Sequence, residues 1–134
     1  MRTLLALVAA GLALIAAGAS IVSGDDDVVG FFLVLTVVAV VIAVTCARPS
    51  PGRARIVARV LAGAWAFAAI WIAVLLGWYQ TSCACSTPVP IEPGPNVAGL
   101  PTTLFHLLAT YVGGVLVVVA TFSDRLATRG DERR

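Results

Sequence analysis

The stretch VVGFFLVLTVVAVVIAV, residues 28–44, decides how the chain folds. Its valines and isoleucine are β-branched, and in water such a run would favour a β-strand. It belongs, however, to a charge-free segment from Val28 to Ala47, which as a helix is about 30 Å long, the thickness of the hydrocarbon core of a bilayer. In lipid an open strand would leave its backbone groups unpaired, whereas a helix pairs them internally. The stretch therefore predicts a transmembrane helix.

Three further segments share this length and this lack of charge: Thr3–Ser23, Val60–Tyr79 and Thr103–Phe122. Of the 134 residues, 60% are hydrophobic and 12% are charged, whereas soluble domains carry about 25% charged residues. We therefore predict an all-α fold, a single transmembrane domain covering residues 1–134. Its four helices span the membrane at 3–23, 28–47, 60–79 and 103–122, with an outer loop at 80–102 and a cytoplasmic tail at 123–134.

Arginine provides all the basic charge, because the chain has no lysine and nine arginines. Every arginine lies before the first segment, between the second and third, or after the fourth: Arg2; Arg48, Arg53, Arg55 and Arg59; Arg125, Arg129, Arg133 and Arg134. Since basic loops stay on the cytoplasmic side of the membrane, we predict that both termini are cytoplasmic and that the 80–102 loop is outside. The absence of lysine, with abundant alanine, valine and glycine, suggests a GC-rich bacterial genome, and hence the cytoplasmic (inner) membrane of a bacterium.

The first segment has a second interpretation, as a cleaved signal peptide. It combines Arg2, an apolar centre and the small residues AGA at 17–19, which resemble a signal-peptidase site. The apolar run continues through Ile21 and Val22, however, and small residues are common in packed membrane helices. We expect the helix to be retained, while cleavage would leave three spans with the same orientation.

Small side chains are expected to hold the helices together, since lipid provides no hydrophobic drive for helix association. The second segment has fewer of them and is expected to face lipid more. The middle of the third contains Trp71, whose indole N–H is expected to need a partner or a packed position. Packing within one bundle and packing between copies both remain open. The small positions are Ala6, Ala10, Ala13 and Ala17 in the first segment, Ala58, Ala62, Ala66, Ala69, Ala73 and Gly77 in the third, and Ala109 and Gly113 in the fourth.

Cys83 and Cys85 stand one residue apart where the third segment enters the outer loop. Thiols outside the cytoplasm are usually oxidised, but a disulfide between these two would close a very small, strained ring. Nor is the spacing the Cys-x-x-Cys of redox enzymes. Three interpretations remain: an internal disulfide, a cross-link to another chain, or ligation of a soft metal ion. Structural cystine, internal or intermolecular, is the favoured interpretation.

His106 is the only histidine and lies one turn into the fourth segment, near the depth of the cysteine loop. Ionisable residues within a span are often functional. Together with Cys83 and Cys85, His106 would provide three ligands for copper or zinc, with Glu92 or water as a fourth. The favoured alternative is a neutral His106 that is hydrogen-bonded to a neighbouring helix or faces interfacial water.

Several polar residues are explained by helix ends and by the membrane surface. We expect Gly24 to end the first helix and Asp25–Asp27 to cap the second, rather than to bind calcium. A threonine of the pair 102–103 is expected to act as N-cap of the fourth helix. Arg53, Arg55 and Arg59 are predicted to contact lipid headgroups, at about 1 kcal/mol each against anionic lipid. Nucleic acid is not an expected partner.

The middle of each span contains no Asp, Glu, Lys or Arg, although ion-coupled transporters generally need such a charge. The chain also offers no recognisable set of catalytic residues. We therefore predict a non-enzymatic accessory, scaffold or complex-subunit protein without a cofactor, which binds lipid and either a membrane-protein partner or further copies of itself. The alternatives are a thiol redox or metal-handling protein using Cys83, Cys85 and His106, or a small transporter or channel subunit.

Overall fold

The computed structural model describes residues 1–47, 52–83, 96–97 and 99–131. Helix α1 covers Arg2–Ser23, α2 covers Asp26–Ala47 and α3 covers Gly52–Cys83. A last helical rod consists of α4 (Thr102–Leu107), a π-helical turn η1 (Leu108–Val112) and α5 (Gly113–Asp131). In this part of the chain, four helices are long and apolar enough to cross a membrane. The prediction of an all-helical fold with four candidate spans is confirmed.

A small hairpin interrupts the helices in a region predicted to be loop. Strand β1 (Asn96–Val97) pairs antiparallel with β2 (Leu100–Pro101), and Gly99 in the turn has φ +79°. Helix α4 then begins directly after Pro101, which is extended and occupies the N-cap position without a side-chain hydrogen bond. The expected threonine N-cap is therefore wrong. Proline fixes the backbone before the helix without contributing a cap, and Thr102 is already the first helical residue.

The turn between α1 and α2 follows the predicted pattern. Gly24 adopts a left-handed conformation with φ 75°, and its N–H donates to the carbonyl of Ile21 at 3.2 Å. The next N–H, of Asp25, donates to the carbonyl of Ser20 at 2.9 Å. Helix α2 starts at once, with Asp26 and Asp27 in its first turn, where carboxylates interact favourably with the positive end of the helix dipole. This turn makes α1 and α2 an antiparallel pair.

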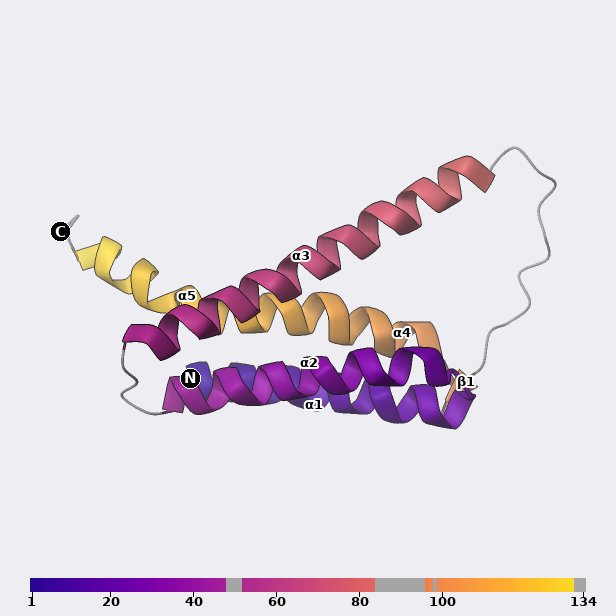
Figure 1. The fold of residues 1–134 in the computed structure, drawn as a ribbon, viewed down its shortest axis with the longest axis horizontal. Helices are drawn as coiled ribbons and strands as arrows, with labels where there is room; N and C mark the ends of the chain where they lie inside the picture. Colours follow the sequence, from indigo (N-terminus) through magenta and orange to yellow (C-terminus); the bar gives the residue numbers. More distant parts are fainter. Residues whose placement is uncertain (48–51, 84–95, 98, 132–134) are drawn as a thin grey trace.

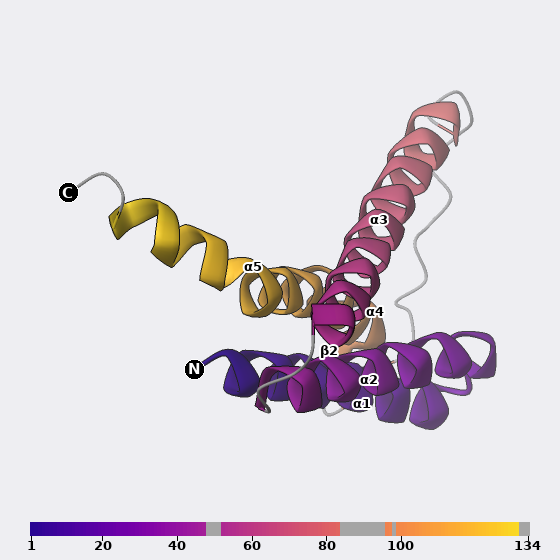
Figure 2. The same cartoon turned by 60° about the vertical axis from the view of Figure 1, so that its left-hand side comes forward.

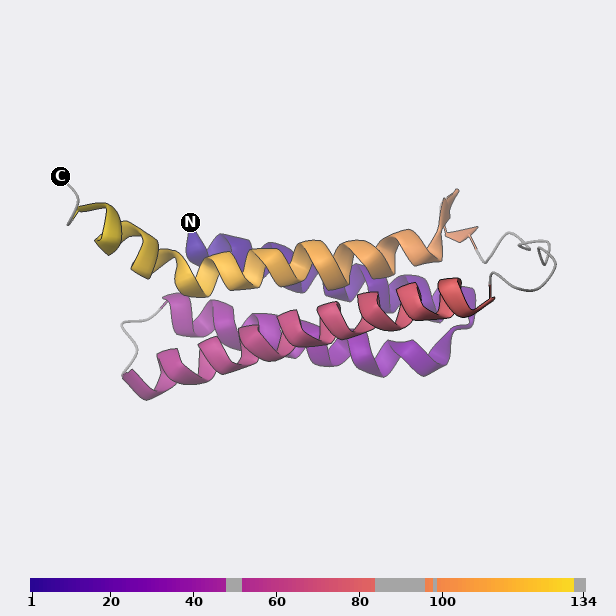
Figure 3. The same ribbon diagram turned by 90° about the horizontal axis from the view of Figure 1, so that it is seen from above.

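Helix α1 lies at the centre of the packing. It contacts α2 along its length and also α4, η1 and α5, and Figure 3 shows α5 running beside α1 while α3 lies over α2. The contact face of α1 consists almost entirely of alanine, which lets the neighbouring backbones approach closely. The prediction that small residues of α1 pack is confirmed by the buried set Ala6, Ala9, Ala10, Ala13, Ala16 and Ala17.

Helix α3 departs from the rest of the bundle. It begins at Gly52, before the predicted span, and its later turns rise away from α1 and α2 (Figures 1 and 2). Only 17% of its apolar window is buried, against 28% for α2. The second helix, expected to face lipid more, is less buried than α1 at 44% and the last rod at 33%, but α3 is less buried still. Most positions between the alanines of α3 carry large residues, which limit close packing to one narrow face of the helix. The buried alanines among the described residues of α3 are Ala58, Ala62 and Ala69.

Candidate functional site

A buried serine and the only histidine meet where α1 and α4 contact each other. Ser20 lies in the last turn of α1 and is fully buried, and its Oγ is 2.8 Å from Nε2 of His106. The Ser20 hydroxyl also donates to the carbonyl of Ala16 at 2.9 Å. A hydroxyl has a single hydrogen, so with that hydrogen on Ala16 the Ser20 Oγ accepts from Nε2 of His106 in the tautomer that is protonated there. The histidine is thus fixed to a neighbouring helix.

Aromatic stacking also holds the imidazole ring of His106 in place. Phe32, from the second turn of α2, stacks on His106 with the ring centroids 4.8 Å apart and an angle of 27° between the planes. Phe31 meets Phe32 edge-on, with centroids 5.3 Å apart. Offset stacking and edge-to-face contacts are the favourable arrangements of aromatic rings. Three helices, α1, α2 and α4, therefore determine the position and tilt of one side chain.

A cavity of about 400 Å³ opens beside this histidine, between α2, α3 and α4. We call it the His106 cavity. Its walls are apolar or aromatic apart from His106 and the threonines at 103 and 110, and they include Phe31, Phe32, Ile72, Leu76 and Tyr111. The departure of α3 from the bundle creates this space, because Ile72 and Leu76 belong to its outward-leaning half (Figure 1).

A second hollow, of about 590 Å³, runs along the other side of α3. We call it the α3–α5 groove. Small and aliphatic residues line it, among them Ala66, Ala69 and Ala73 of α3 and Gly114 and Val118 of α5. Tyr111 lines both this groove and the His106 cavity. Two apolar hollows thus flank the same poorly buried helix.

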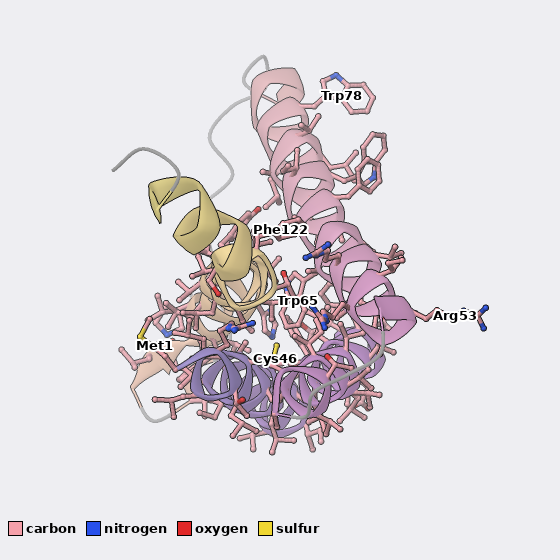
Figure 4. The ribbon with its side chains drawn as sticks, turned by 90° about the vertical axis from the view of Figure 1, so that its left-hand side faces the viewer. Met1, Cys46, Arg53, Trp65, Trp78 and Phe122 are labelled. Carbon is pink, nitrogen blue, oxygen red and sulfur yellow. The ribbon has the colours of Figure 1, made fainter. Side chains whose placement is uncertain are left out.

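Trp65 attaches the first half of α3 to the bundle. Its side chain is 2% exposed, and its Nε1 donates to the backbone carbonyl of Thr110 at 3.0 Å. Figure 4 shows Trp65 directed between the helices, whereas Trp78 at the far end of α3 points away from them. Trp71, expected to be packed, is instead 55% exposed and stacks on Phe67. That expectation is wrong because α3 has already left its neighbours at this height.

The π-helical turn lies where this tryptophan docks. Such wide turns inside α-helices are often found at functional sites. The two residues after η1 are Gly113 and Gly114, and a Cβ atom added at either would lie 3.1 Å from a carbon of the Trp65 indole. Glycine at both positions therefore makes room for the ring. The sequence indicated small residues here, but nothing in their spacing shows that they receive an aromatic side chain.

At the opposite end of the bundle, the three arginines predicted to contact headgroups behave differently. Arg53 and Arg55 are exposed, and Figure 4 shows Arg53 directed away from the helices. Arg59 is half-buried, with its guanidinium carbon 5.9 Å from the centroid of the Phe122 ring, within reach of a cation–π interaction. Its Nε is buried with no hydrogen-bond partner among the described residues. Headgroup contact by these arginines stays a prediction.

The proposed metal and disulfide residues are only partly within the described structure. His106 is described, but Cys85, Glu92 and the Cys83 side chain lie outside the described residues. Among the described residues, no group of three His, Cys, Asp or Glu side chains is placed to hold a metal ion. Cys46, the one cysteine whose side chain is described, has its Sγ 3.9 Å from the carbonyl oxygen of Ala120. Ligation or cross-linking by Cys83 and Cys85 therefore stays a prediction.

Sequence reasoning singled out His106 but neither of its partners. Ser20 lies 86 positions away and looks like one more small residue in the alanine-rich face of α1. Phe32 belongs to the apolar stretch at residues 28–44, where nothing distinguishes it from its neighbours. The signal that was available is the spacing of Ala16 and Ser20, one turn apart on the face that packs. No family model, curated protein or solved structure matches the chain.

Proposed function

We propose that the chain is a multi-pass protein of the bacterial cytoplasmic membrane, with a non-enzymatic role as a subunit or accessory protein. Its position in a membrane is supported by the four apolar helices and the 31 exposed large hydrophobic side chains of the described residues, such as Leu14, Ile70 and Val115. Surfaces of soluble monomers rarely carry apolar patches of this extent. Lipid tails cover such a surface without the free-energy penalty that apolar side chains have in contact with water.

The distribution of charge supports cytoplasmic termini. Arg2 begins α1, Arg53, Arg55 and Arg59 lie in the first turns of α3, and Arg125 and Arg129 lie in the last turns of α5. All of these turns belong to one end of the antiparallel bundle, whereas Asp25–Asp27 lie at the other (Figure 1). An arginine-rich end stays on the cytoplasmic side during insertion.

The α3–α5 groove is the observation that carries the proposed role. Helices associate in membranes through close packing of small residues, and in the lining of this groove Ala66 is half-buried and Ala73 is exposed, whereas Gly114 is buried against the Trp65 ring. A membrane-spanning helix of another protein would pack there against α3 and α5. The large side chains on other faces of α3, such as Phe67 and Trp71, offer no such close approach.

A photo-crosslinking amino acid at position 73, in the groove, tests this proposal in intact membranes. We expect it to capture a partner through a peptide from one of the partner's apolar spans, identified by mass spectrometry. The matched control is position 64, which is also an exposed alanine of α3. Nine residues at about 100° each place it on the opposite side of the helix, so we expect at most background cross-linking there.

A competing variant sharpens the result. Ala73→Trp fills the groove, and we expect it to lower recovery of the same partner by about tenfold, since overpacking an apolar contact costs about 1–3 kcal/mol. Ala64→Trp should leave recovery unchanged. Equal cross-linking at 73 and 64, or cross-links at 73 only to a second copy of this chain, would overturn the proposal of a different protein as the occupant.

A further inference from the structure

The geometry points to the His106 cavity as a binding site for a lipophilic molecule with a hydroxyl on an aromatic ring, the chemistry of membrane-soluble quinols and phenols. The inference needs the membrane location proposed above but not the partner helix. It concerns binding at equilibrium and involves no chemical step. Three features carry it: the hydrogen-bonding state of His106, the nature of the cavity walls and the route of entry.

The hydrogen-bonding state of His106 follows from Ser20. With the Ser20 hydrogen on the Ala16 carbonyl, the contact of Ser20 Oγ with Nε2 favours the neutral tautomer of His106 in which Nε2 carries the hydrogen. The other nitrogen, Nδ1, is then a bare acceptor. It has no hydrogen-bond donor among the described residues, and His106 lines the cavity. An unpaired acceptor in an apolar environment is unfavourable, so a ligand that supplies an O–H is favoured over one that does not.

The cavity walls favour a flat ring. Phe31, Phe32 and Tyr111 contribute aromatic surfaces on two sides of the space, and the imidazole itself is held stacked on Phe32. A planar aromatic head can stack on such rings in an offset arrangement while its hydroxyl meets Nδ1. The volume, about 400 Å³, falls in the range of about 300–1,000 Å³ typical of small-molecule sites.

The cavity is reached from the side of the bundle. Leu76 and Leu107, which line it, are 48% and 46% exposed. In a membrane these residues face lipid tails, so a ligand would enter from the bilayer with its apolar part left in the lipid. This arrangement disfavours a strongly polar or charged head, because the polar groups of the cavity lining are one imidazole, two threonines and the Tyr111 hydroxyl, with no charged side chain among the lining residues.

A single histidine makes the test direct. The full-length protein, labelled with ¹⁵N-histidine, is placed in lipid nanodiscs of phosphatidylethanolamine and phosphatidylglycerol, and the imidazole nitrogens are observed by NMR. We expect a neutral ring protonated at Nε2. Adding 1-naphthol should shift the Nδ1 resonance in the direction of hydrogen-bond acceptance, while 1-methoxynaphthalene, which has the same ring but no donor, should not.

Affinity gives a second, independent measurement. We expect 1-naphthol to bind about tenfold more tightly than 1-methoxynaphthalene, the effect of one hydrogen bond. His106→Phe keeps an aromatic ring against Phe32 but removes the acceptor, so it should abolish this preference. Leu76→Trp fills the cavity while His106 itself is unchanged, and it should abolish binding of both compounds. Leu75→Trp, on the neighbouring residue that lines neither hollow, should leave binding unchanged.

Each contrary result overturns the inference. A ring protonated at Nδ1 would remove the acceptor. Equal binding and equal Nδ1 shifts with the two naphthalene compounds would show that the cavity holds only apolar chains such as lipid tails. Equal loss of binding in the Leu75→Trp and Leu76→Trp variants would place the ligand elsewhere, and that result would leave the proposed partner groove unaffected.

Discussion

At the scale of single residues, the indole of Trp65 donates a buried hydrogen bond from α3 to the last helical rod. Trp65→Phe keeps most of the ring and removes the N–H. Interhelical hydrogen bonds in membranes contribute about 0.6–1.7 kcal/mol, so we expect the free energy of unfolding to fall by about 1 kcal/mol. The measurement is equilibrium unfolding in mixed micelles with increasing sodium dodecyl sulfate.

Trp71→Phe is the matched control, because Trp71 lies on the same helix but is 55% exposed and makes no indole hydrogen bond among the described residues. Its effect should remain within about 0.5 kcal/mol. Equal losses in the two variants would mean that the contact between Nε1 and the Thr110 carbonyl contributes nothing to stability.

The two tryptophans also show what the sequence can and cannot predict about single residues. Hydropathy and length place both tryptophans in the third span. A buried indole N–H also needs a hydrogen-bond acceptor. Which of the two is buried depends on the angle at which α3 crosses the bundle. That angle follows from Gly113 and Gly114 on another helix, which admit the Trp65 ring. The Ser20–His106 contact was unpredictable for the same reason, since it joins helices whose relative rotation no single segment encodes.

At the scale of whole elements, the glycines of α3 and α5 should respond to alanine in opposite directions. Gly63→Ala adds a methyl group where no atom lies within 4 Å, so it should stabilise α3 by about 0.5–1 kcal/mol through helix propensity. Gly114→Ala gains the same propensity but places its Cβ 3.1 Å from a Trp65 carbon and 3.2 Å from Nε1. Moving that buried ring costs about 1–3 kcal/mol.

We therefore expect Gly114→Ala to lower the unfolding midpoint in the same mixed-micelle assay and Gly63→Ala to raise it. The double variant Gly114→Ala with Trp65→Ala removes the clash, so the added cost of Gly114→Ala should vanish in that background. If Gly114→Ala remained equally destabilising without the indole, close contact with Trp65 would not be the cause.

Element boundaries follow from composition more securely than element partners do. The four apolar windows predicted the four long helices, because backbone pairing in lipid leaves no other conformation for such runs. The positions of proline and glycine predicted the turn at Gly24 and the break before α3. The alanine series of α1 and α3 look equally suited to packing in the sequence, yet α1 is surrounded and α3 is not. The difference comes from the arrangement of the whole bundle, since α1 contacts both α2 and α5 extensively, whereas α3 contacts these two helices less.

At the scale of the whole molecule, the asymmetry of charge between the two ends predicts a fixed orientation in the membrane. In a background with Cys46, Cys83 and Cys85 replaced by alanine, single cysteines are introduced by Asp26→Cys at the acidic end and Gly52→Cys at the basic end. Neither change removes an arginine, and acidic residues contribute little to orientation. A membrane-impermeant maleimide added to intact cells should label position 26 and not position 52, which should become reactive only after permeabilisation.

Labelling of position 52 from outside would mean that the bundle has the opposite orientation in the membrane. The His106 cavity would then open in the inner leaflet and Arg59 would lie in the outer one, where the positive-inside bias leaves no reason for four arginines to gather between α2 and the second turn of α3. The orientation therefore decides which leaflet supplies the ligand, and the labelling pattern is its most direct measurement.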